Sequence, residues 1–327
     1  MNSASVLIVN YNGAADLPLC LESLSRQTLP PTETLLVDNH STDDSCQIAS
    51  RFPGVSILSN SENIGFAGAA NLGAALACGD VLVLLNTDLE LVSTFLEEGM
   101  RAMQPPDVAA VASKILFFDR RNVINGIGGG MNYLGYGWDR GLNEIDHGQY
   151  DTSEEVFFAS GGACFLRREL FLALGGFDPR FFMYHEDVDF CWRARLAGYR
   201  VVACPAAVVY HKYGATTRRE LGWDRREILG ERHNFRSLLK NYRLHNAIRA
   251  LRDILLIPLP WKRKWAQLRN LMVNLAWLPD TLKLRRMVQA TRRLSDADLK
   301  KFILQSHAVP VKASAPDSPA PAPARTA

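Results

Sequence analysis

The sequence of 327 residues predicts an α/β fold: a mixed, mostly parallel sheet flanked by helices, with a basic helical extension at the C-terminal end. Short apolar runs alternate with helical segments through the first half, as in parallel sheets. Clusters of Asn and Asp directly follow three of these runs. After about residue 218 the pattern becomes helical and basic. The composition, 47% hydrophobic and 22% charged, is that of an ordinary globular protein.

The first half is expected to alternate strands and helices. Buried strands are indicated by apolar runs of four or five residues, and helices by apolar residues at helical spacing, as for Leu17, Leu21 and Leu24. The expected strands are Val6–Val9, Thr34–Val37, Val55–Leu58, Val81–Leu85 and Val108–Val111. The expected helices are Leu17–Leu24, Asp43–Arg51, Gly65–Cys78 and Val92–Met103.

The middle of the chain is predicted to complete the same domain. Asn122–Gln149 is dense in Gly, Asn and Tyr and is interpreted as a long loop, a feature that is usually functional or mobile. Apolar strand character returns at Phe157–Leu166. Two helices and two late strands are then expected at Arg168–Leu174, Val188–Leu196, Arg200–Ala203 and Ala207–Tyr210.

The predicted division is a catalytic-type domain over residues 1–217, a helical basic extension over 218–307, and a tail over 308–327. The first domain is expected to have one half at about 1–115 and another at about 116–217. Pro258 and Pro279 interrupt the helical pattern of the extension. The tail consists mainly of Pro, Ala and Ser, a composition typical of disorder.

The net charge of +3 conceals an asymmetry between the extension and the rest. Residues 240–300 contain 14 Lys and Arg against 4 Asp, so this segment carries 14 − 4 = +10 and the remainder −7. No DNA-binding fingerprint is present, so nucleic acid is not an expected partner. Trp261, Trp265 and Trp277 lie among the basic residues, as in an amphipathic helix on an anionic membrane surface. Packing of the extension on the catalytic body is an equally good interpretation.

The six cysteines form no C-x-x-C motif, which argues against zinc and redox sites and suits a reducing compartment. The N-terminus enters a strand-like run without the features of a signal peptide, and no apolar run reaches the roughly 18–20 residues of a membrane span. We therefore expect a cytoplasmic protein, either free or peripheral on the inner face of the cytoplasmic membrane.

Polar clusters at the ends of three strands predict a ligand site. They are Asn10–Asn12, Asp38–Asn39 and Asn86–Asp88, and in open α/β sheets ligands bind at the carboxyl ends of the strands. Asp88, together with His211 after a late strand, would suit Mg²⁺ or Mn²⁺ beside a diphosphate. A turn explains any single cluster as well, but three at successive strand ends favour a pocket.

In the segment His185–Asp189, three of four consecutive residues carry carboxylates, and the segment lies inside an aromatic stretch. Like charges this close repel, and apolar neighbours raise carboxylate pKa values, so the arrangement is costly. A site that holds a proton acceptor accounts for that cost. The alternative is a helix N-terminus, where acidic residues are favoured by the helix dipole.

The glycine pattern excludes two nucleotide-binding classes. Asn63–Gly68 could offer backbone N–H groups to a phosphate, but it lacks the Gly-Lys-Ser/Thr ending of a P-loop. No Gly-x-Gly-x-x-Gly follows the first strand, which disfavours a dinucleotide dehydrogenase. Tight helix–sheet packing explains these glycines equally well.

The chain resembles family 2 glycosyltransferases, and most nearly their rhamnosyltransferase-like branch. The matching motifs occur in order from about Val6 to Thr217, which is two thirds of the chain. The motifs that carry the resemblance are Val9–Asn12, Val37–Asp43, Glu62–Ala67, Leu85–Asp88, Gly175–Asp178 and Glu186–Asp189. The resemblance implies a GT-A fold, an inverting mechanism, a divalent metal (Mg²⁺ or Mn²⁺) and a nucleoside-diphosphate sugar as donor.

The resemblance also implies roles for individual residues. Asp187 matches the catalytic base, with Glu186 beside it as the weaker candidate. Asp88 and His211 match metal-binding positions, although the first residue of the metal motif is Asn86 here instead of Asp. The implied donor-binding residues are Asn10, Asn12, Asp38, Asn63 and Asn86, with Asp38 at the position that reads the nucleobase. The implied acceptor region contains Gly161, Gly162 and Trp192.

The implied reaction transfers rhamnose from dTDP-rhamnose to a hydroxyl of a cell-envelope or polysaccharide acceptor, which includes lipid-linked glycans. A UDP-hexose (galactose-type) transferase of the same fold and a non-catalytic glycan- or membrane-binding module are the alternatives. A nucleotidyltransferase is disfavoured because Val9–Gly13 offers one glycine and no Lys or Arg.

Overall fold

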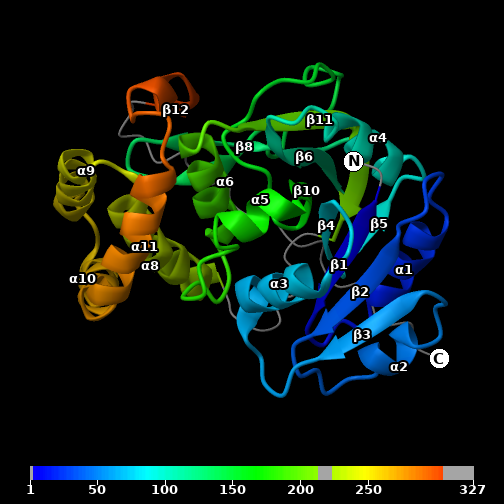
Figure 1. Cartoon of the computed structure of the whole chain (residues 1–327). Helices are drawn as coiled ribbons and strands as arrows, with labels where there is room; N and C mark the ends of the chain where they lie inside the picture. The colour runs from blue at the N-terminus through cyan, green and yellow to red at the C-terminus, as the bar shows by residue number, and fades with distance from the viewer. Residues whose placement is uncertain (1–2, 213–222, 305–327) are drawn as a thin grey trace, which may run out of the picture.

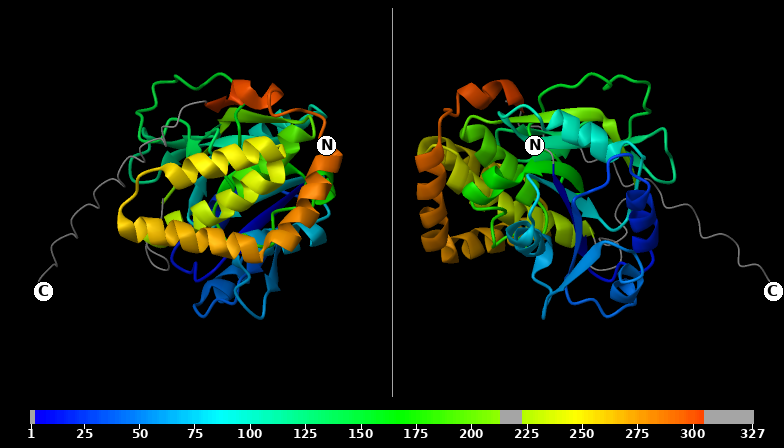
Figure 2. Two further views of the ribbon diagram at one scale, coloured as in Figure 1. Left: turned by 90° about the vertical axis from the view of Figure 1, so that its left-hand side faces the viewer. Right: turned by 45° about the vertical axis from the view of Figure 1, so that its right-hand side comes forward.

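The structure is a computed structural model that describes residues 3–212 and 223–304. A twisted mixed sheet lies between two layers of helices, and the C-terminal helices form a further layer at one end (Figures 1 and 2). The predicted mixed, mostly parallel sheet with flanking helices is confirmed. Residues Tyr213–Thr217 at the predicted domain boundary, and the predicted tail 308–327, lie outside the described residues.

The first half follows the predicted alternation. Its parallel strands are β1 (Ala4–Asn10), β2 (Glu33–Asp38), β3 (Val55–Ser59) and β4 (Val81–Asn86), in the spatial order β3-β2-β1-β4. Its helices are α1 (Leu17–Ser25), α2 (Ser45–Ala49), α3 (Gly65–Leu76) and α4 (Phe95–Ala102).

Successive residues of the central strands belong to two different cores. In β1, Leu7 packs with α3 on one face, while Val6 and Ile8 pack with α1 on the other. Because both faces of the sheet are covered, these strands are continuous apolar runs in sequence instead of alternating polar and apolar. In β1, β2 and β4 the last residues, Asn10, Asp38 and Asn86, are polar, and they gather at one edge of the sheet.

The second half extends the sheet with antiparallel pairs. Strand β10 (Ala163–Arg167) pairs antiparallel with β4 and β6 (Val108–Phe117), and β11 (Arg200–His211) pairs parallel with β6 and antiparallel with β5 (Leu89–Leu91). The two expected late strands are one strand, β11, interrupted by a register shift between Cys204 and Val208. The helices here are α5 (Arg168–Ala173) and α6 (Glu186–Leu196).

The prediction of a structureless loop over Asn122–Gln149 is wrong. The segment contains β7 (Ile124–Ile127), β8 (Gly129–Asn132) and β9 (Gly137–Asp139). These strands are three or four residues long and rich in glycine, so their sequence lacks the periodicity that marks a strand. Similarly, of the predicted strand Phe157–Leu166 only the last residues form β10, because Ser160–Gly162 make a turn first.

The C-terminal extension is helical, as predicted. It comprises α8 (Trp223–Asn241), α9 (Leu244–Leu256), α10 (Trp261–Ala276) and α11 (Leu278–Thr291), followed by a short 3₁₀ turn (Asp298–Phe302) and β12 (Ile303–Leu304). Strand β12 pairs with β8, so the extension is joined to the α/β domain by backbone as well as by side chains. None of the helices described is both long and apolar enough to cross a membrane.

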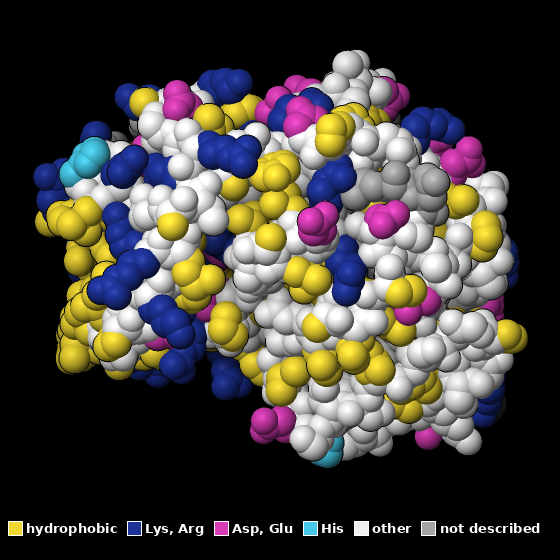
Figure 3. All heavy atoms as spheres, in the orientation of Figure 1, with side chains coloured by type: hydrophobic (Ala, Val, Ile, Leu, Met, Phe, Trp, Pro, Cys, Tyr) yellow, Lys and Arg dark blue, Asp and Glu magenta, His cyan; other side chains and the backbone are white. Residues whose placement is uncertain are grey.

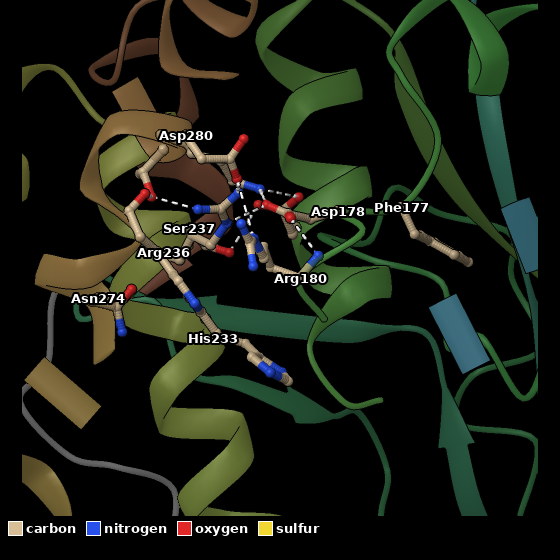
Figure 4. Close-up of polar contacts among 12 residues, drawn as sticks. Phe177, Asp178, Arg180, His233, Arg236, Ser237, Asn274 and Asp280 are labelled. Atoms are coloured by element: carbon tan, nitrogen blue, oxygen red, sulfur yellow. Dashed lines mark hydrogen bonds and ion pairs between the residues drawn. The ribbon is translucent and has the colours of Figure 1, made fainter. Parts of the chain in front are cut away.

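Buried charges connect α8 to α6 and to the turn before it (Figure 4). Arg236 donates to Asp178 at 2.7 Å and to Asp280 at 2.6 Å, and both it and Asp178 are almost completely buried. Ser237 and Lys240 donate to Asp189 of α6 at 2.8 and 3.1 Å. Buried charges that are paired and hydrogen-bonded in this way are costly to separate, so the network fixes α6 relative to α8.

Candidate active site

The carboxyl ends of β1, β2 and β4 lie side by side at one edge of the sheet. Asn10 pairs in register with Asp38, and Val9 pairs with Asn86, all between parallel strands. The structure thus brings the three polar clusters of the sequence to a single edge, where α/β proteins bind ligands.

Asp38 is held in one orientation by its neighbours. Its Oδ1 accepts hydrogen bonds from Asn10 Nδ2 at 2.7 Å and from the Ser41 hydroxyl at 2.5 Å, and its Oδ2 accepts from the Ser41 backbone N–H at 3.1 Å. A carboxylate fixed in this way can present its remaining lone pairs to a donor at the pocket wall.

Asn10 itself is completely buried and contacts Asp38, Ser41 and Ser45. Its side chain orients Asp38. A direct role of Asn10 in donor binding stays a prediction. The close approach of the Asn10 amide also explains Gly13, where a Cβ would lie 2.4 Å from Asn10 Oδ1.

Asn12 and Asn63 shape the loops around this edge. Asn12, with a positive φ of 50°, accepts the backbone N–H of Thr42 at 2.9 Å and so joins the loop after β1 to the loop after β2. Asn63 accepts the backbone N–H of Gly65 at 2.9 Å at the start of α3. That N–H is therefore already bonded within the chain, which weakens the expectation that the start of α3 meets a phosphate.

Asp88 and His211 meet directly, as the resemblance implies for a metal site. His211 Nε2 lies 3.3 Å from Asp88 Oδ1, while its Nδ1 lies 2.9 Å from Asn125 Oδ1 in β7. A partner at Nδ1 sets the tautomer and aims Nε2, which is how metal-binding histidines are usually oriented. Burial alone would raise the pKa of the Asp88 carboxyl, but His211 and Lys212 outweigh it, so the pKa lies below its usual value.

These residues fit a metal that is shared with a diphosphate and do not form a protein cage. In the described part of the chain, no three His, Cys, Asp or Glu side chains gather closely enough to hold an ion. Mg²⁺ and Mn²⁺ commonly take one or two protein ligands and complete their shell with phosphate oxygens and water. Asp88 and His211 supply such a pair.

The candidate base Asp187 is in the first turn of α6. Its Oδ2 accepts the backbone N–H of Gly161 at 2.9 Å, and its Oδ1 accepts the backbone N–H of Val188 at 2.8 Å. Burial raises the pKa of Asp187, and these two N–H groups act in the opposite direction. A carboxylate whose pKa is raised is a stronger base than an exposed one.

Glu186 differs from Asp187 in its surroundings. It is buried, its Oε2 has no hydrogen-bond partner within the described structure, and burial followed by the charge of Asp187 raises its pKa to about 8. The N–H donors therefore favour the negative charge of this adjacent pair on Asp187, while burial favours the protonated form of Glu186. The geometry favours Asp187 over Glu186 as proton acceptor.

The turn Ser160–Gly162 connects the base to the strand ends. Gly161 donates to Asp187, and the carbonyl of Gly162 accepts the backbone N–H of Asn86 at 2.9 Å. A Cβ at Gly161 would approach Phe66 to 3.2 Å, and one at Gly162 would approach Asn86 Nδ2 to 3.2 Å. The two predicted acceptor-region glycines thus allow the base and the metal-binding motif to come together.

The backbone that leads into α6 is strained. Tyr184 and His185 both have positive φ angles, 72° and 77°, which side-chain-bearing residues rarely adopt. His233 of α8 donates from Nδ1 to the carbonyl of Tyr184 at 2.8 Å and stacks on Phe181 at 4.4 Å. Strained backbone is found where surrounding structure fixes it, and often at functional sites.

The structure changes one sequence expectation for this region, Trp192, and adds one residue, Asn125. Trp192 is completely buried, against Phe157 and Tyr242, so it supports α6 from the core and does not contact an acceptor. Asn125 was missed, although a single amide in the apolar run Ile124–Ile127 is a signal that could have identified it. Its role depends on contact with His211, which is 86 positions away.

Comparison with known proteins agrees with the resemblance. Residues 5–175 match the family described as glycosyl transferase family 2. An N-acetylglucosaminyl-diphospho-decaprenol L-rhamnosyltransferase of Mycobacterium tuberculosis is 32% identical over 66% of this chain and 78% of its own length. An O-antigen chain rhamnosyltransferase of Salmonella typhimurium is 27% identical over 66% of this chain and 68% of its own.

Solved structures agree in fold. GalNAc-T7 with UDP, GalNAc and Mn²⁺ superposes with a TM-score of 0.62 at 17% identity, over 82% of this chain and 54% of that one. A mannosyltransferase from Pyrobaculum calidifontis in complex with GDP-Man and Mn²⁺ gives 0.54 at 17% identity, over 88% and 85%. The predicted GT-A fold is confirmed, and the chain belongs to glycosyl transferase family 2.

Proposed function

We propose that this chain is a metal-dependent, inverting rhamnosyltransferase that uses dTDP-rhamnose and acts on a hydroxyl of a cell-envelope or polysaccharide glycan, including lipid-linked glycans. The rhamnosyltransferase names of its relatives from M. tuberculosis and S. typhimurium support the sugar and the class of acceptor. The observation that carries a catalytic function is the turn at Gly161 and Gly162, which ties Asp187 to the strand end that leads to Asp88.

The proposed reaction is a single displacement. Asp187 takes the proton of the acceptor hydroxyl as that oxygen attacks the anomeric carbon from the face opposite the diphosphate. The new C–O bond forms while the bond to the diphosphate breaks, and the nucleoside diphosphate leaves with the electron pair. Attack from the opposite face inverts the configuration at that carbon.

The other site residues would bind and orient. Asp38, held by Asn10 and Ser41, would accept a hydrogen bond from the nucleobase. Asp88 and His211 would hold the divalent cation, with Asn125 keeping the His211 ring in place. When bound, the cation supplies charge neutralisation for the leaving diphosphate.

The first test is thermal stabilisation by nucleotide sugars. dTDP-, UDP- and GDP-linked sugars would be screened with and without Mg²⁺ or Mn²⁺, for the wild type, Asp88→Ala and the exposed control Glu22→Ala. Stabilisation by dTDP-rhamnose that needs the metal and is lost only in Asp88→Ala is expected. At a hundredfold excess over the Kd the shift corresponds to about 2.7 kcal/mol.

Other outcomes of the screen are equally informative. Preference for a UDP-hexose would replace the proposed donor with the galactose-type alternative. Absence of stabilisation by every nucleotide sugar would contradict the assigned donor site and favour a non-catalytic binding protein.

A further inference from the structure

Helix α10 exposes its apolar face and buries its polar one. Gln267, Asn270 and Asn274 are at most 2% exposed, and all three lie on the side of the helix that packs against α8. A surface helix normally has the opposite arrangement, with its apolar stripe facing the core.

The amide nitrogens of the buried polar face donate hydrogen bonds that include contacts with α8. Asn270 Nδ2 donates to the carbonyl of Ile228 at 2.9 Å, and Asn274 Nδ2 donates to the carbonyl of Arg232 at 3.0 Å. Asn270 and Gln267 also donate to Glu231 at 3.0 and 3.3 Å. Because these contacts fix the rotation of α10 about its own axis, the apolar stripe is held facing outward.

The outward stripe is continuous along the whole helix. Its residues follow one another at intervals of four, three, four and three, so they lie within one narrow sector of the helix. They are Trp261, Trp265, Leu268, Met272 and Leu275, all exposed, with Trp261 71% exposed. Leu256, at the end of α9 and 72% exposed, is a further apolar residue next to this helix in sequence. Large side chains this exposed, in one contiguous stripe, mark an interaction surface.

Positive charge surrounds the stripe. Exposed cations flank it on α10 and continue onto the neighbouring helices: Lys262, Arg269, Arg249, Arg252, Lys283 and Arg286. The acids of α9–α11, Asp253 and Asp280, are already engaged by arginines. Figure 3 shows the hydrophobic and basic side chains together on the flank formed by these helices, and Figure 2 shows α9, α10 and α11 as the outermost layer there.

We propose that the outer face of α9–α11, centred on the α10 stripe, is a docking surface for an anionic membrane. Two tryptophans beside cations suit the interface between lipid headgroups and acyl chains. There the apolar part of each indole can contact acyl chains while its N–H group contacts water or headgroups. Each cation near an anionic leaflet adds favourable energy, whereas a second copy of this surface would bring like charges together. Trp277 is not part of the surface, because its ring faces Arg180 and Arg236 inside the helical layer.

This proposal goes beyond the proposed sugar transfer and does not depend on it. It also combines two interpretations of the basic extension: α8 packs on the catalytic body, and the outer helices face a membrane.

Vesicle co-sedimentation of the full chain tests the proposal. Binding is expected to vesicles that contain phosphatidylglycerol, to be weak with phosphatidylcholine alone, and to fall at high salt. Trp261→Gln combined with Trp265→Gln should lower the partition coefficient about tenfold or more, because the apolar insertion is lost. Lys262→Gln combined with Arg269→Gln should lower it roughly tenfold for anionic vesicles only.

Matched controls separate the surface from general effects. Leu76→Gln removes an equally exposed apolar residue from α3, and Arg51→Gln removes an exposed cation far from the extension; neither should change binding. Since the substituted side chains are exposed, the variants should keep their melting temperature and their stabilisation by donor nucleotide, so a failed membrane test is distinct from a failed donor test.

Two results would overturn the proposal. One is vesicle binding of the wrong kind: either equal binding to neutral and anionic vesicles, or binding to anionic vesicles that the tryptophan variant retains. The other is a dimer in solution, seen by light scattering, that dissociates in the tryptophan variant while no vesicle binding is found; the surface would then be an interface between two copies.

Discussion

Lys240 of α8 lies 3.1 Å from the carboxylate of Asp189 in α6 and also contacts Asp178 in the turn before that helix. One ammonium thus joins two buried carboxylates of the catalytic half to the C-terminal extension. Burial alone would raise the pKa of Asp189, but Lys240 and Arg193 reverse the effect and hold it far below its usual value. Asp189 anchors α6 to α8, because its carboxylate accepts hydrogen bonds from Ser237, Lys240 and Asn241 of α8.

Replacing Lys240 by Met should therefore lower the free energy of unfolding. Asp178 would keep Arg236 and Asp189 would keep Arg193, but each buried carboxylate would lose one charged hydrogen-bond partner, a loss of about 1–3 kcal/mol. The free energy of unfolding in urea measures the effect. Lys283→Met, an exposed lysine of α11, is the control and should change stability little. A loss below about 1 kcal/mol for Lys240→Met would mean that the network does not anchor α6.

Asp187→Asn should abolish turnover and preserve the fold. The amide keeps an oxygen for the N–H of Gly161 but cannot take a proton, and general-base catalysis contributes about 10²–10⁴-fold. The rate of sugar transfer and the thermal shift with donor nucleotide would both be measured, with Glu22→Gln as control. Activity within threefold of wild type would exclude Asp187 as the base.

Glu186→Gln should change how stability depends on pH. In the native protein Glu186 has a pKa of about 8, above its ordinary 4.5, so the folded state holds a proton that the unfolded state releases between these values. Its contribution is present below about pH 4.5 and is lost as the pH rises through about 8. Melting temperatures from pH 5 to 9 should fall less steeply for the variant than for wild type. Parallel curves would show that Glu186 is already ionised.

Gly65→Ala should destabilise the protein, whereas Gly230→Ala should not. Gly65 has a φ of +77°, and a Cβ there would lie 2.2 Å from the backbone oxygen of Phe182, so the loss should exceed about 1 kcal/mol. Gly230, inside α8, has no atom within 4 Å of the added Cβ, and alanine there should stabilise the helix by about 0.5–1 kcal/mol. The free energy of unfolding in urea would be measured for both variants. Equal effects of the two substitutions would contradict the tight contact between Gly65 and Phe182.

Asn125→Ala should weaken metal activation without altering the fold. Losing the partner of His211 Nδ1 frees the ring to rotate, and such second partners typically change metal affinity by about 10–100-fold. The Mn²⁺ concentration for half-maximal transfer would be compared with that of Asn122→Ala, an exposed asparagine before β7. An unchanged metal requirement would remove His211 from the metal site.

The parts of the fold that could be predicted are those that depend on local pattern. Strands β1, β2 and β4 are continuous apolar runs, and their polar ends at Asn10, Asp38 and Asn86 indicated the pocket edge directly. Strands β7, β8 and β9 could not be predicted, because they are short and glycine-rich and because β8 also pairs with β12, at the far end of the described chain. The role of Asn125 was hidden because its partner, His211, is distant in sequence.

The sequence by itself determined the α/β alternation, the edge at which the polar motifs gather and the ordered motifs that identify the family, because strand and helix periodicity and turn chemistry act over a few residues. Tertiary structure alone decided that burial raises the pKa of Glu186, that Asp187 receives two backbone N–H donors, that Trp192 is core, and that α10 is turned with its apolar face outward. Each of these depends on which distant groups surround a side chain, since burial and hydrogen-bond partners set its charge state and its exposure.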